Sequence, residues 1–117
     1  MEYFFVGLGG ACGSLLRYYL GRFITSKSNS SFPLGTFIIN ITGAILLGIF
    51  NSISMDKNIS ILICDGFLGA YTTFSTFIYE GFNLFNNKKT NALVYIIISL
   101  FLGVLGYLFG IKIFKII

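Results

Sequence analysis

The stretch from Gly66 to Phe77, GFLGAYTTFSTF, constrains the fold most, because it lies in an apolar segment and yet makes a poor helix. Gly66 and Gly69 weaken helical backbone, and the hydroxyl side chains between Thr72 and Thr76 compete for backbone hydrogen bonds. At membrane depth, irregular backbone is tolerated only where protein buries it or where it lines a polar cavity. A broken helix also exposes backbone groups that can hold ions. The stretch therefore predicts a helix that is broken in mid-membrane, with an ion site at the break.

Composition places the whole chain in a membrane. Of its 117 residues, 56% are hydrophobic and 10% are charged, whereas about 25% of residues are charged in a soluble domain. The length predicts a single domain over residues 1–117. Basic residues at the membrane surfaces explain the net charge of +4, and no basic cluster indicates nucleic-acid binding.

Few residues could carry acid–base or metal chemistry. The chain has no histidine, which excludes imidazole metal sites, a serine–histidine–aspartate triad and a histidine proton relay. Its acids are Glu2, Asp56, Asp65 and Glu80, too few to favour an enzyme. The cysteines, Cys12 and Cys64, lie in apolar segments without metal-ligand spacing and are expected to be packing residues.

Four apolar segments are each near the roughly 20 residues that a membrane-spanning helix needs. Short polar links separate these segments, and no link is long enough to divide domains. The fold class expected is an all-α integral membrane protein of four helices, with the third helix broken. The expected helices cover about residues 3–24, 32–53, 59–85 and 92–114.

Small residues four apart predict close helix packing. In the first helix, Gly9, Gly13 and Gly21 share a face with Arg17, and in the fourth helix Gly106 and Gly110 form a GxxxG pair. A charge within a span costs about 2.5–3.5 kcal/mol, so the arginine should find a partner or water, unless it reaches the interface. Glu80 is a candidate partner for this arginine or for a lysine, in a structural role.

The second helix should open at Pro33, with Ser30 or Ser31 as its cap. Thr36, Asn40 and Gly43 then share one face. Asn40 lies about 10 Å along the helix from the proline, well inside the membrane. Its amide either bridges two helices or donates N–H groups to an ion in a polar path.

Neutral polar groups on three helices suggest a path for a small anion. They are Thr36 with Asn40, the run 72–76, and Tyr95 with Ser99, whose face Gly103 continues. Hydroxyl and amide donors can replace the hydration of an anion without trapping it as a fixed cation would. The positive ring edges of Phe74 and Phe77 can do the same. Two alternatives are a stacked aromatic core and, for a lone serine, a bond to its own backbone.

Three motifs resemble the Fluc/CrcB fluoride channels of bacteria: GGACGSLLRY (9–18), PLGTFIINITG (33–43) and GFLGAYTTFSTFIYE (66–80). The resemblance covers three predicted helices by motif and the fourth by length and polarity. It implies a fluoride-selective passive ion channel of the bacterial cell membrane, which exports fluoride and reduces its toxicity. It also implies an antiparallel, dual-topology dimer with two pores, formed with a second copy or a paralogous subunit in the lipid bilayer.

The resemblance also assigns site residues. Phe74 and Phe77 match the phenylalanine box, Arg17 matches a vestibule arginine, and the backbone carbonyls of Gly69 and Thr72 match those that hold a structural sodium ion at the dimer axis. The full set of implied fluoride-pore residues is Phe74, Phe77, Asn40, Thr36, Ser99, Tyr95, Thr73, Ser75 and Thr76.

Three positions depart from the family pattern. Gly103 stands where some relatives carry a hydroxyl, Asp65 is an unusual charge beside the break, and Tyr71 is bulky. No physical account of Asp65 follows from the sequence.

The basic residues of the links give a weak orientation bias. Arg22, Lys27, Lys88 and Lys89 fall on one side of the membrane, against Lys57, Lys112 and Lys115 on the other. Such a small difference is compatible with insertion in both orientations, and it leaves homodimer and heterodimer open.

Two other functions remain alternatives. A small proton-coupled four-helix exporter would want a glutamate in the middle of the first helix, where this chain has only Glu2 at the end. A non-conducting scaffold or partner subunit would have no reason to keep Asn40 together with Phe74 and Phe77.

Overall fold

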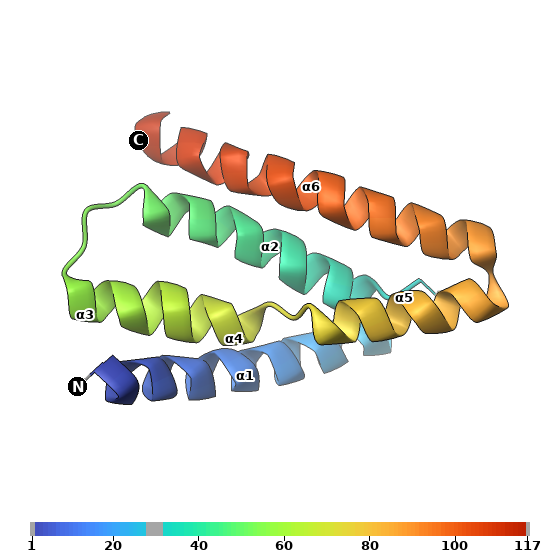
Figure 1. Cartoon of the computed structure of the whole chain (residues 1–117), viewed down its shortest axis with the longest axis horizontal. Helices are drawn as coiled ribbons and strands as arrows, with labels where there is room; N and C mark the ends of the chain where they lie inside the picture. The colour runs from blue at the N-terminus through green and yellow to red at the C-terminus, as the bar shows by residue number, and fades with distance from the viewer. Residues whose placement is uncertain (1, 28–31, 117) are drawn as a thin grey trace.

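The helices lie side by side along the length of the molecule, and the start of α1 and the end of α6 lie at the same end of the bundle (Figure 1). The computed structural model describes residues 2–27 and 32–116, and this part of the chain contains helices and no strand. Its extents are 46 × 31 × 22 Å. The elements are α1 (Glu2–Lys27), α2 (Leu34–Asn51), α3 (Lys57–Ser60), the π-helix η1 (Ile61–Leu68), α4 (Gly69–Tyr71), α5 (Ser75–Asn87) and α6 (Lys89–Ile116).

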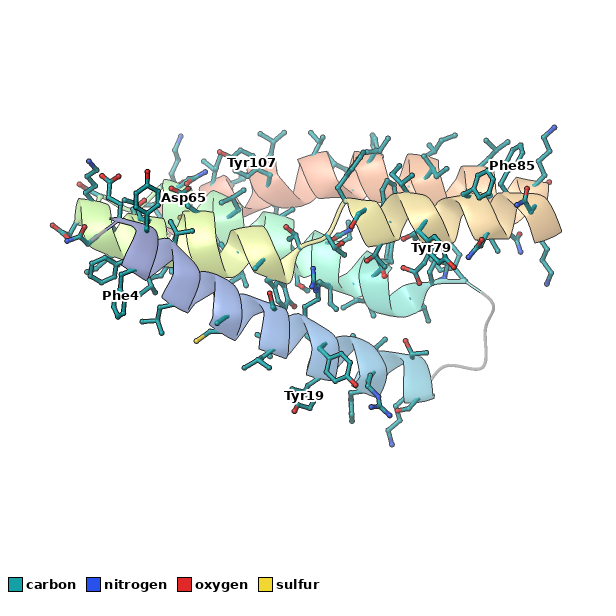
Figure 2. The ribbon with its side chains drawn as sticks, turned by 60° about the horizontal axis from the view of Figure 1, so that its bottom comes forward. Phe4, Tyr19, Asp65, Tyr79, Phe85 and Tyr107 are labelled. Atoms are coloured by element: carbon teal, nitrogen blue, oxygen red, sulfur yellow. The ribbon has the colours of Figure 1, made fainter. Side chains whose placement is uncertain are left out.

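Among the described residues, three segments are long and apolar enough to cross a membrane: Leu34–Asn51, Lys57–Asn86 and Lys89–Lys115. The remaining rod, α1, has the length at 26 residues but is less apolar than α2 or α6. Phe4 and Tyr19 project from α1 away from the other helices (Figure 2). The fold is therefore all-helical, with three segments that can span a membrane.

The third rod is built from α3, η1, α4 and α5, and its break lies at 72–74. Thr72 is extended there, with φ −80° and ψ 159°. The break thus falls after the two glycines, because Gly66 and Gly69 are both in helical backbone. Packing explains the first of them: a Cβ on Gly66 would lie 2.7 Å from the Val6 carbonyl oxygen of α1.

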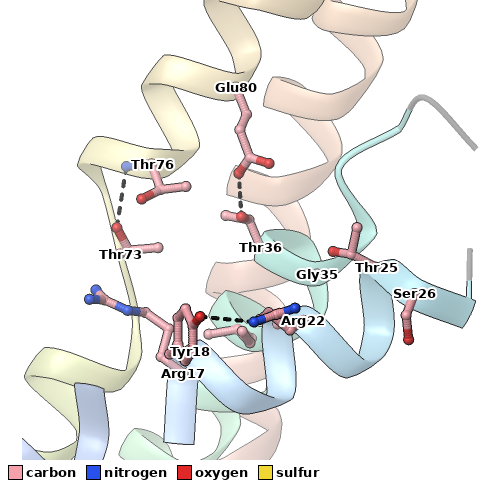
Figure 3. Close-up of a pocket in the computed structure, with 12 residues that line it drawn as sticks. Arg17, Tyr18, Arg22, Thr25, Ser26, Gly35, Thr36, Thr73, Thr76 and Glu80 are labelled. Atoms are coloured by element: carbon pink, nitrogen blue, oxygen red, sulfur yellow. Dashed lines mark hydrogen bonds between the residues drawn. The ribbon is translucent and has the colours of Figure 1, made fainter. Parts of the chain in front are cut away.

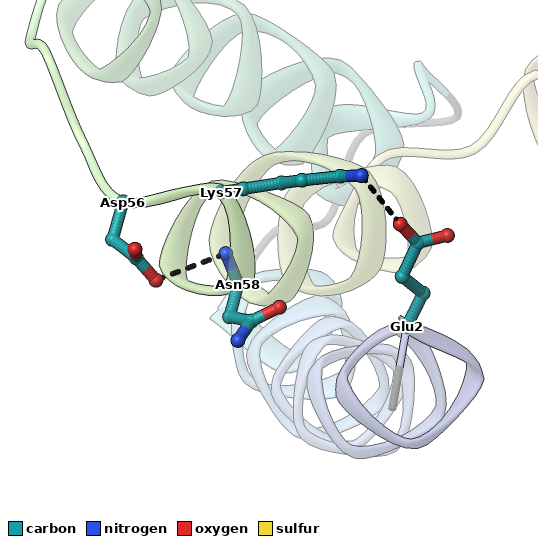
Figure 4. Close-up of polar contacts among 4 residues, drawn as sticks. All are labelled: Glu2, Asp56, Lys57 and Asn58. Carbon is teal, nitrogen blue, oxygen red and sulfur yellow. Dashed lines mark hydrogen bonds and ion pairs between the residues drawn. The ribbon is translucent and has the colours of Figure 1, made fainter.

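Polar contacts fix the start of this rod (Figure 4). The Asp56 side chain caps α3 by accepting from the Asn58 N–H at 3.2 Å. Lys57 Nζ lies 2.7 Å from Glu2 Oε1, which joins the start of α3 to the start of α1. Since both side chains are mostly exposed, this ion pair adds little stability.

Glycines set the distances between the rods. A Cβ on Gly9 or Gly13 of α1 would lie 2.1 Å from a backbone oxygen of η1, that of Leu62 or Phe67. On the other side of the bundle, a Cβ on Gly110 of α6 would lie 2.2 Å from the Ile45 oxygen of α2. The predicted close packing is confirmed at Gly9, Gly13 and Gly110, where helix backbones touch.

Two helix ends differ slightly from those expected. Pro33 is the N-cap of α2, one residue before the helix, and Ser30 and Ser31 lie outside the described residues. The last helix begins at Lys89, earlier than position 92, and only Lys88 separates it from α5. The polar residues before the apolar segment are already helical, because a helix can begin before its apolar part does.

Gly13→Ala should destabilise the protein although alanine is the better helix former. The new methyl group would collide with the Phe67 carbonyl of η1, and overpacking of this kind costs about 1–3 kcal/mol. Gly7→Ala is the matched control, since nothing lies within 4 Å of a Cβ there. Thermal unfolding in detergent should show a lower midpoint for the first variant alone; equal midpoints would contradict the packing described.

Candidate functional site

Asn40 of α2 holds the break in the third rod. Its side-chain oxygen accepts from the Thr73 N–H at 2.9 Å, and its amide nitrogen donates to the Thr73 carbonyl at 2.9 Å. One side chain thereby satisfies both backbone groups of the residue at the break. Of the two roles left open for this amide, the structure shows the bridge between helices. Because an amide has two N–H donors, one can still serve another acceptor.

This pairing frees backbone carbonyls. In a regular helix the Thr73 N–H would donate to the Gly69 carbonyl, but here it donates to Asn40. Likewise, the Thr76 N–H in the first turn of α5 donates to the Thr73 hydroxyl at 3.2 Å and not to the Thr72 carbonyl. The carbonyls of Gly69 and Thr72 therefore both lose their regular helical donors. Gly69 and Thr72 both line a cavity of about 250 Å³, together with Asn40 and the buried Cys64.

A groove of about 330 Å³ opens at the break, between α2, α5 and α6. We call it the phenylalanine groove. It brings together five of the predicted pore residues: Asn40, Thr73, Phe74, Phe77 and Ser99. Its remaining lining residues are Thr72, Leu100, Gly103 and Val104.

The two phenylalanines of this groove have different environments. Phe77 is 5% exposed and its ring centroid lies 5.2 Å from that of Tyr95, so it belongs to a buried aromatic cluster. Phe74 is 73% exposed, with its centroid 6.1 Å from that of Phe77. The stacked-core interpretation thus describes the inner ring, whereas the outer ring is open to a ligand or a partner.

Two hydroxyl groups of α6 are buried without a hydrogen bond to the described residues. They are Tyr95 Oη and Ser99 Oγ, in residues that are 0% and 8% exposed. The serine does not bond back to its own helix, although a lone serine in a membrane helix commonly does. An unpaired buried polar group costs about 1–3 kcal/mol. Both hydroxyls would therefore be stabilised by a polar or charged ligand to which they can donate. Ser99 lines the phenylalanine groove, and Tyr95 lies one turn before it.

A second cavity, of about 450 Å³, lies between α1, α2 and α5 (Figure 3). We call it the arginine cavity. It contains the predicted residues Arg17, Thr36 and Thr76, which are thus separate from the phenylalanines. Thr73 lines both cavities, so the two meet at the residue that Asn40 holds.

Arg17 does not form the expected ion pair with Glu80. Both residues border the arginine cavity, but Glu80 accepts a hydrogen bond from the Thr36 hydroxyl. Within residues 2–27 and 32–116, the ion pair found is that of Lys57 with Glu2. The reason is geometric: α5 presents Glu80 to α2, while the half-buried Arg17 side chain points away from Thr36 and Glu80 (Figure 3). The guanidinium is left available to an anion.

Some residues fall outside expectation. Ser75 is exposed and lines neither cavity. Asp65 is exposed on η1 (Figure 2). Among the described residues, no group of three carboxylate or thiol side chains is placed to hold a metal ion. Conversely, Thr25 was missed as a lining residue of the arginine cavity. The four-residue spacing of Arg17 and Gly21 would have found it, had the series been extended by one turn.

Known proteins are similar in sequence to this chain over nearly its whole length. A family model described as "CrcB-like protein, Camphor Resistance (CrcB)" matches residues 4–111. A Clostridium acetobutylicum protein named fluoride-specific ion channel FluC 2 is 60% identical over 111 residues, covering 94% of this chain and 95% of that protein. Two proteins named fluoride-specific ion channel FluC are also similar. That of Thermosipho melanesiensis is 41% identical (94% and 93% covered), and that of a Hydrogenobaculum species is 44% identical (93% and 91%).

Asn40→Leu should loosen the break, because the two backbone groups of Thr73 would lose their partner. Unpaired buried groups cost about 1–3 kcal/mol each, so we expect a lower unfolding midpoint and faster amide exchange at 72–76. Asn51→Leu is the control, since that amide donates one exposed hydrogen bond, to Tyr107. Hydrogen–deuterium exchange by mass spectrometry measures both variants. Unchanged exchange at the break in Asn40→Leu would show that the pair does not hold it.

Proposed function

The chain belongs to the CrcB-like family, and from the name fluoride-specific ion channel that its relatives carry we propose that it is a fluoride-selective passive channel. It is a multi-pass protein of the bacterial cell membrane and not an enzyme. Its activity lets fluoride leave the cell and so reduces fluoride toxicity. The observation that supports this most directly is the phenylalanine groove, where an amide, a hydroxyl and two aromatic rings converge.

Neutral donors of this groove suit fluoride. The free N–H of Asn40 and the unpaired Ser99 hydroxyl can replace water around the ion, and the ring edges of Phe74 and Phe77 add positive potential. None of these groups carries a full positive charge, so an ion held here can leave again. Tyr95 supplies a second unpaired hydroxyl one helical turn away.

The arginine cavity is proposed as the vestibule. Arg17 attracts the anion, and Thr73 lines both this cavity and the phenylalanine groove, which makes the break the point of passage. Thr36 has a lesser part here, because its hydroxyl donates to Glu80. Thr76 lines the vestibule, and Ser75, which lines neither cavity, is proposed only as an outer residue of the path.

The proton-coupled exporter is disfavoured by the place of Glu2. This acid lies at the start of α1, is 56% exposed and pairs with Lys57. A scaffold is disfavoured by the cost of the unpaired hydroxyls on α6, which packing alone would not retain.

A dimer would close the pore. In the single chain Phe74 is 73% exposed, so one wall of the phenylalanine groove is missing. We propose that a second copy in antiparallel orientation, or a paralogous subunit, provides this wall and encloses two pores. The small charge difference between the two sides of the chain supports insertion in both orientations.

A structural sodium ion fits the break. The carbonyls of Gly69 and Thr72 have lost their helical donors, because these N–H groups donate instead to the Asn40 side chain and to the Thr73 hydroxyl. Backbone carbonyls are suitable ligands for a hard cation, and Gly69 is exposed where a partner could approach. Two carbonyls from each of two copies would surround an ion on the dimer axis, which we propose as the sodium site.

Liposomes that contain only the purified chain should release fluoride rapidly and retain chloride. We expect efflux without any imposed proton gradient, because the groove residues do not titrate near neutral pH. Fluoride and chloride electrodes record both ions. No efflux from a dimer verified as assembled and antiparallel would favour the scaffold, whereas efflux that requires a proton gradient would favour the exporter.

Phe77→Ile should abolish fluoride efflux, since isoleucine has the bulk to fill the position but no positive ring edge. Phe82→Ile is the control, because that ring is 62% exposed on the same helix and lines neither cavity. Size-exclusion chromatography should show that both variants assemble as the wild type does. Normal efflux from an assembled Phe77→Ile protein would remove this ring from the mechanism.

A further inference from the structure

A third, apolar groove runs along the outside of the pair α2 and α6. We call it the α2–α6 groove; its volume is about 520 Å³. Apart from one lysine its lining is entirely apolar: Ile41, Ile45, Leu102, Leu105, Gly106, Leu108, Phe109 and Lys112. Gly106 makes the groove deeper, because it has no side chain at a point where a Cβ would lie 3.1 Å from Ile45 Cγ1. This groove shares no lining residue with the phenylalanine groove or the arginine cavity.

The groove has the length of one membrane leaflet. Its α6 residues run from Leu102 to Lys112, which is about 15 Å at 1.5 Å per residue. The hydrocarbon core of a bilayer is about 30 Å thick, so one leaflet contributes about 15 Å. Leu102 lies near the middle of the segment Lys89–Lys115 that can span the membrane. The groove therefore extends from the midplane to the headgroup region.

A single positive charge stands at its outer end. Lys112 is exposed and forms no ion pair with the described residues. The sequences of α2 and α6 contain no aspartate or glutamate, so the two helices that line the groove offer this lysine no carboxylate. An apolar trough one leaflet long, with a cation at the headgroup level, has the charge and shape of a phospholipid site.

We propose that the α2–α6 groove binds one acyl chain of an anionic phospholipid, whose phosphate group pairs with the Lys112 ammonium. The apolar side chains contact the acyl chain, and the lysine selects lipids of net negative charge. A lysine near an anionic membrane surface contributes about fivefold in affinity, which sets the size of the expected preference. The site is independent of fluoride conduction, so it can be tested without an ion-flux measurement.

Native mass spectrometry of the assembled protein can test the charge. The protein is equilibrated with equal amounts of phosphatidylglycerol and phosphatidylcholine that carry the same acyl chains. The wild type should retain phosphatidylglycerol preferentially, and Lys112→Gln should lose about fivefold of that preference. Lys115→Gln is the matched control, because that lysine is exposed on the same helix but does not line the groove. Equal losses in both variants, or no preference in the wild type, would overturn the proposal.

A second variant tests the groove itself. Leu105→Trp should fill the groove and reduce retention of both lipids severalfold, since Leu105 lines the groove and is 44% exposed. Leu93→Trp, at a position of α6 that is 48% exposed and outside the groove, should leave retention unchanged. If Leu105→Trp weakens dimer association and leaves lipid retention intact, a second copy covers the groove and the proposal is wrong.

Discussion

The pair of hydrogen bonds between the Asn40 side chain and the Thr73 backbone is the interaction on which the functional geometry depends. A broken helix leaves amide and carbonyl groups that have no water to bond in a membrane, and each would cost several kcal/mol. Asn40 satisfies one N–H and one C=O at 2.9 Å each. Because the Thr73 amide is thus occupied, the backbone remains extended where it would otherwise continue as a helix. A single amide in α2 therefore makes an open segment stable inside the third rod.

The same pair determines how the cavities are connected. Thr73 is held at the one point that both the arginine cavity and the phenylalanine groove reach. Beyond the break, α5 brings Phe77 against Tyr95 and Glu80 against Thr36. A glycine provides the complementary constraint: a Cβ on Gly43 of α2 would lie 2.2 Å from Thr72 Cγ2, so its absence lets α2 approach the break closely enough for Asn40 to reach Thr73.

Periodicity and residue type were enough to predict the helical rods, the glycine contacts and a break in the third segment. They placed the break too early, because Gly66 was interpreted as a helix breaker when its role is to let Val6 approach. They also suggested Arg17 or a lysine as the partner of Glu80, since opposite charges in one membrane favour pairing, whereas the position of α5 brings the glutamate to Thr36. The partner of Asn40 could not be predicted, because it is a backbone group 33 residues away that depends on how the rods pack.

The unpaired hydroxyls of α6 connect the structure to the proposed function. A buried hydroxyl can find a bond at low cost by turning to a carbonyl of its own helix, as Thr42 does with Ile38. Ser99 makes no such bond and instead borders the phenylalanine groove, beside the exposed Phe74 ring. An unpaired hydroxyl donor next to an exposed aromatic ring lowers the stability of a helix bundle. The same arrangement is a good one for a dehydrated anion, provided that a second subunit supplies the missing wall.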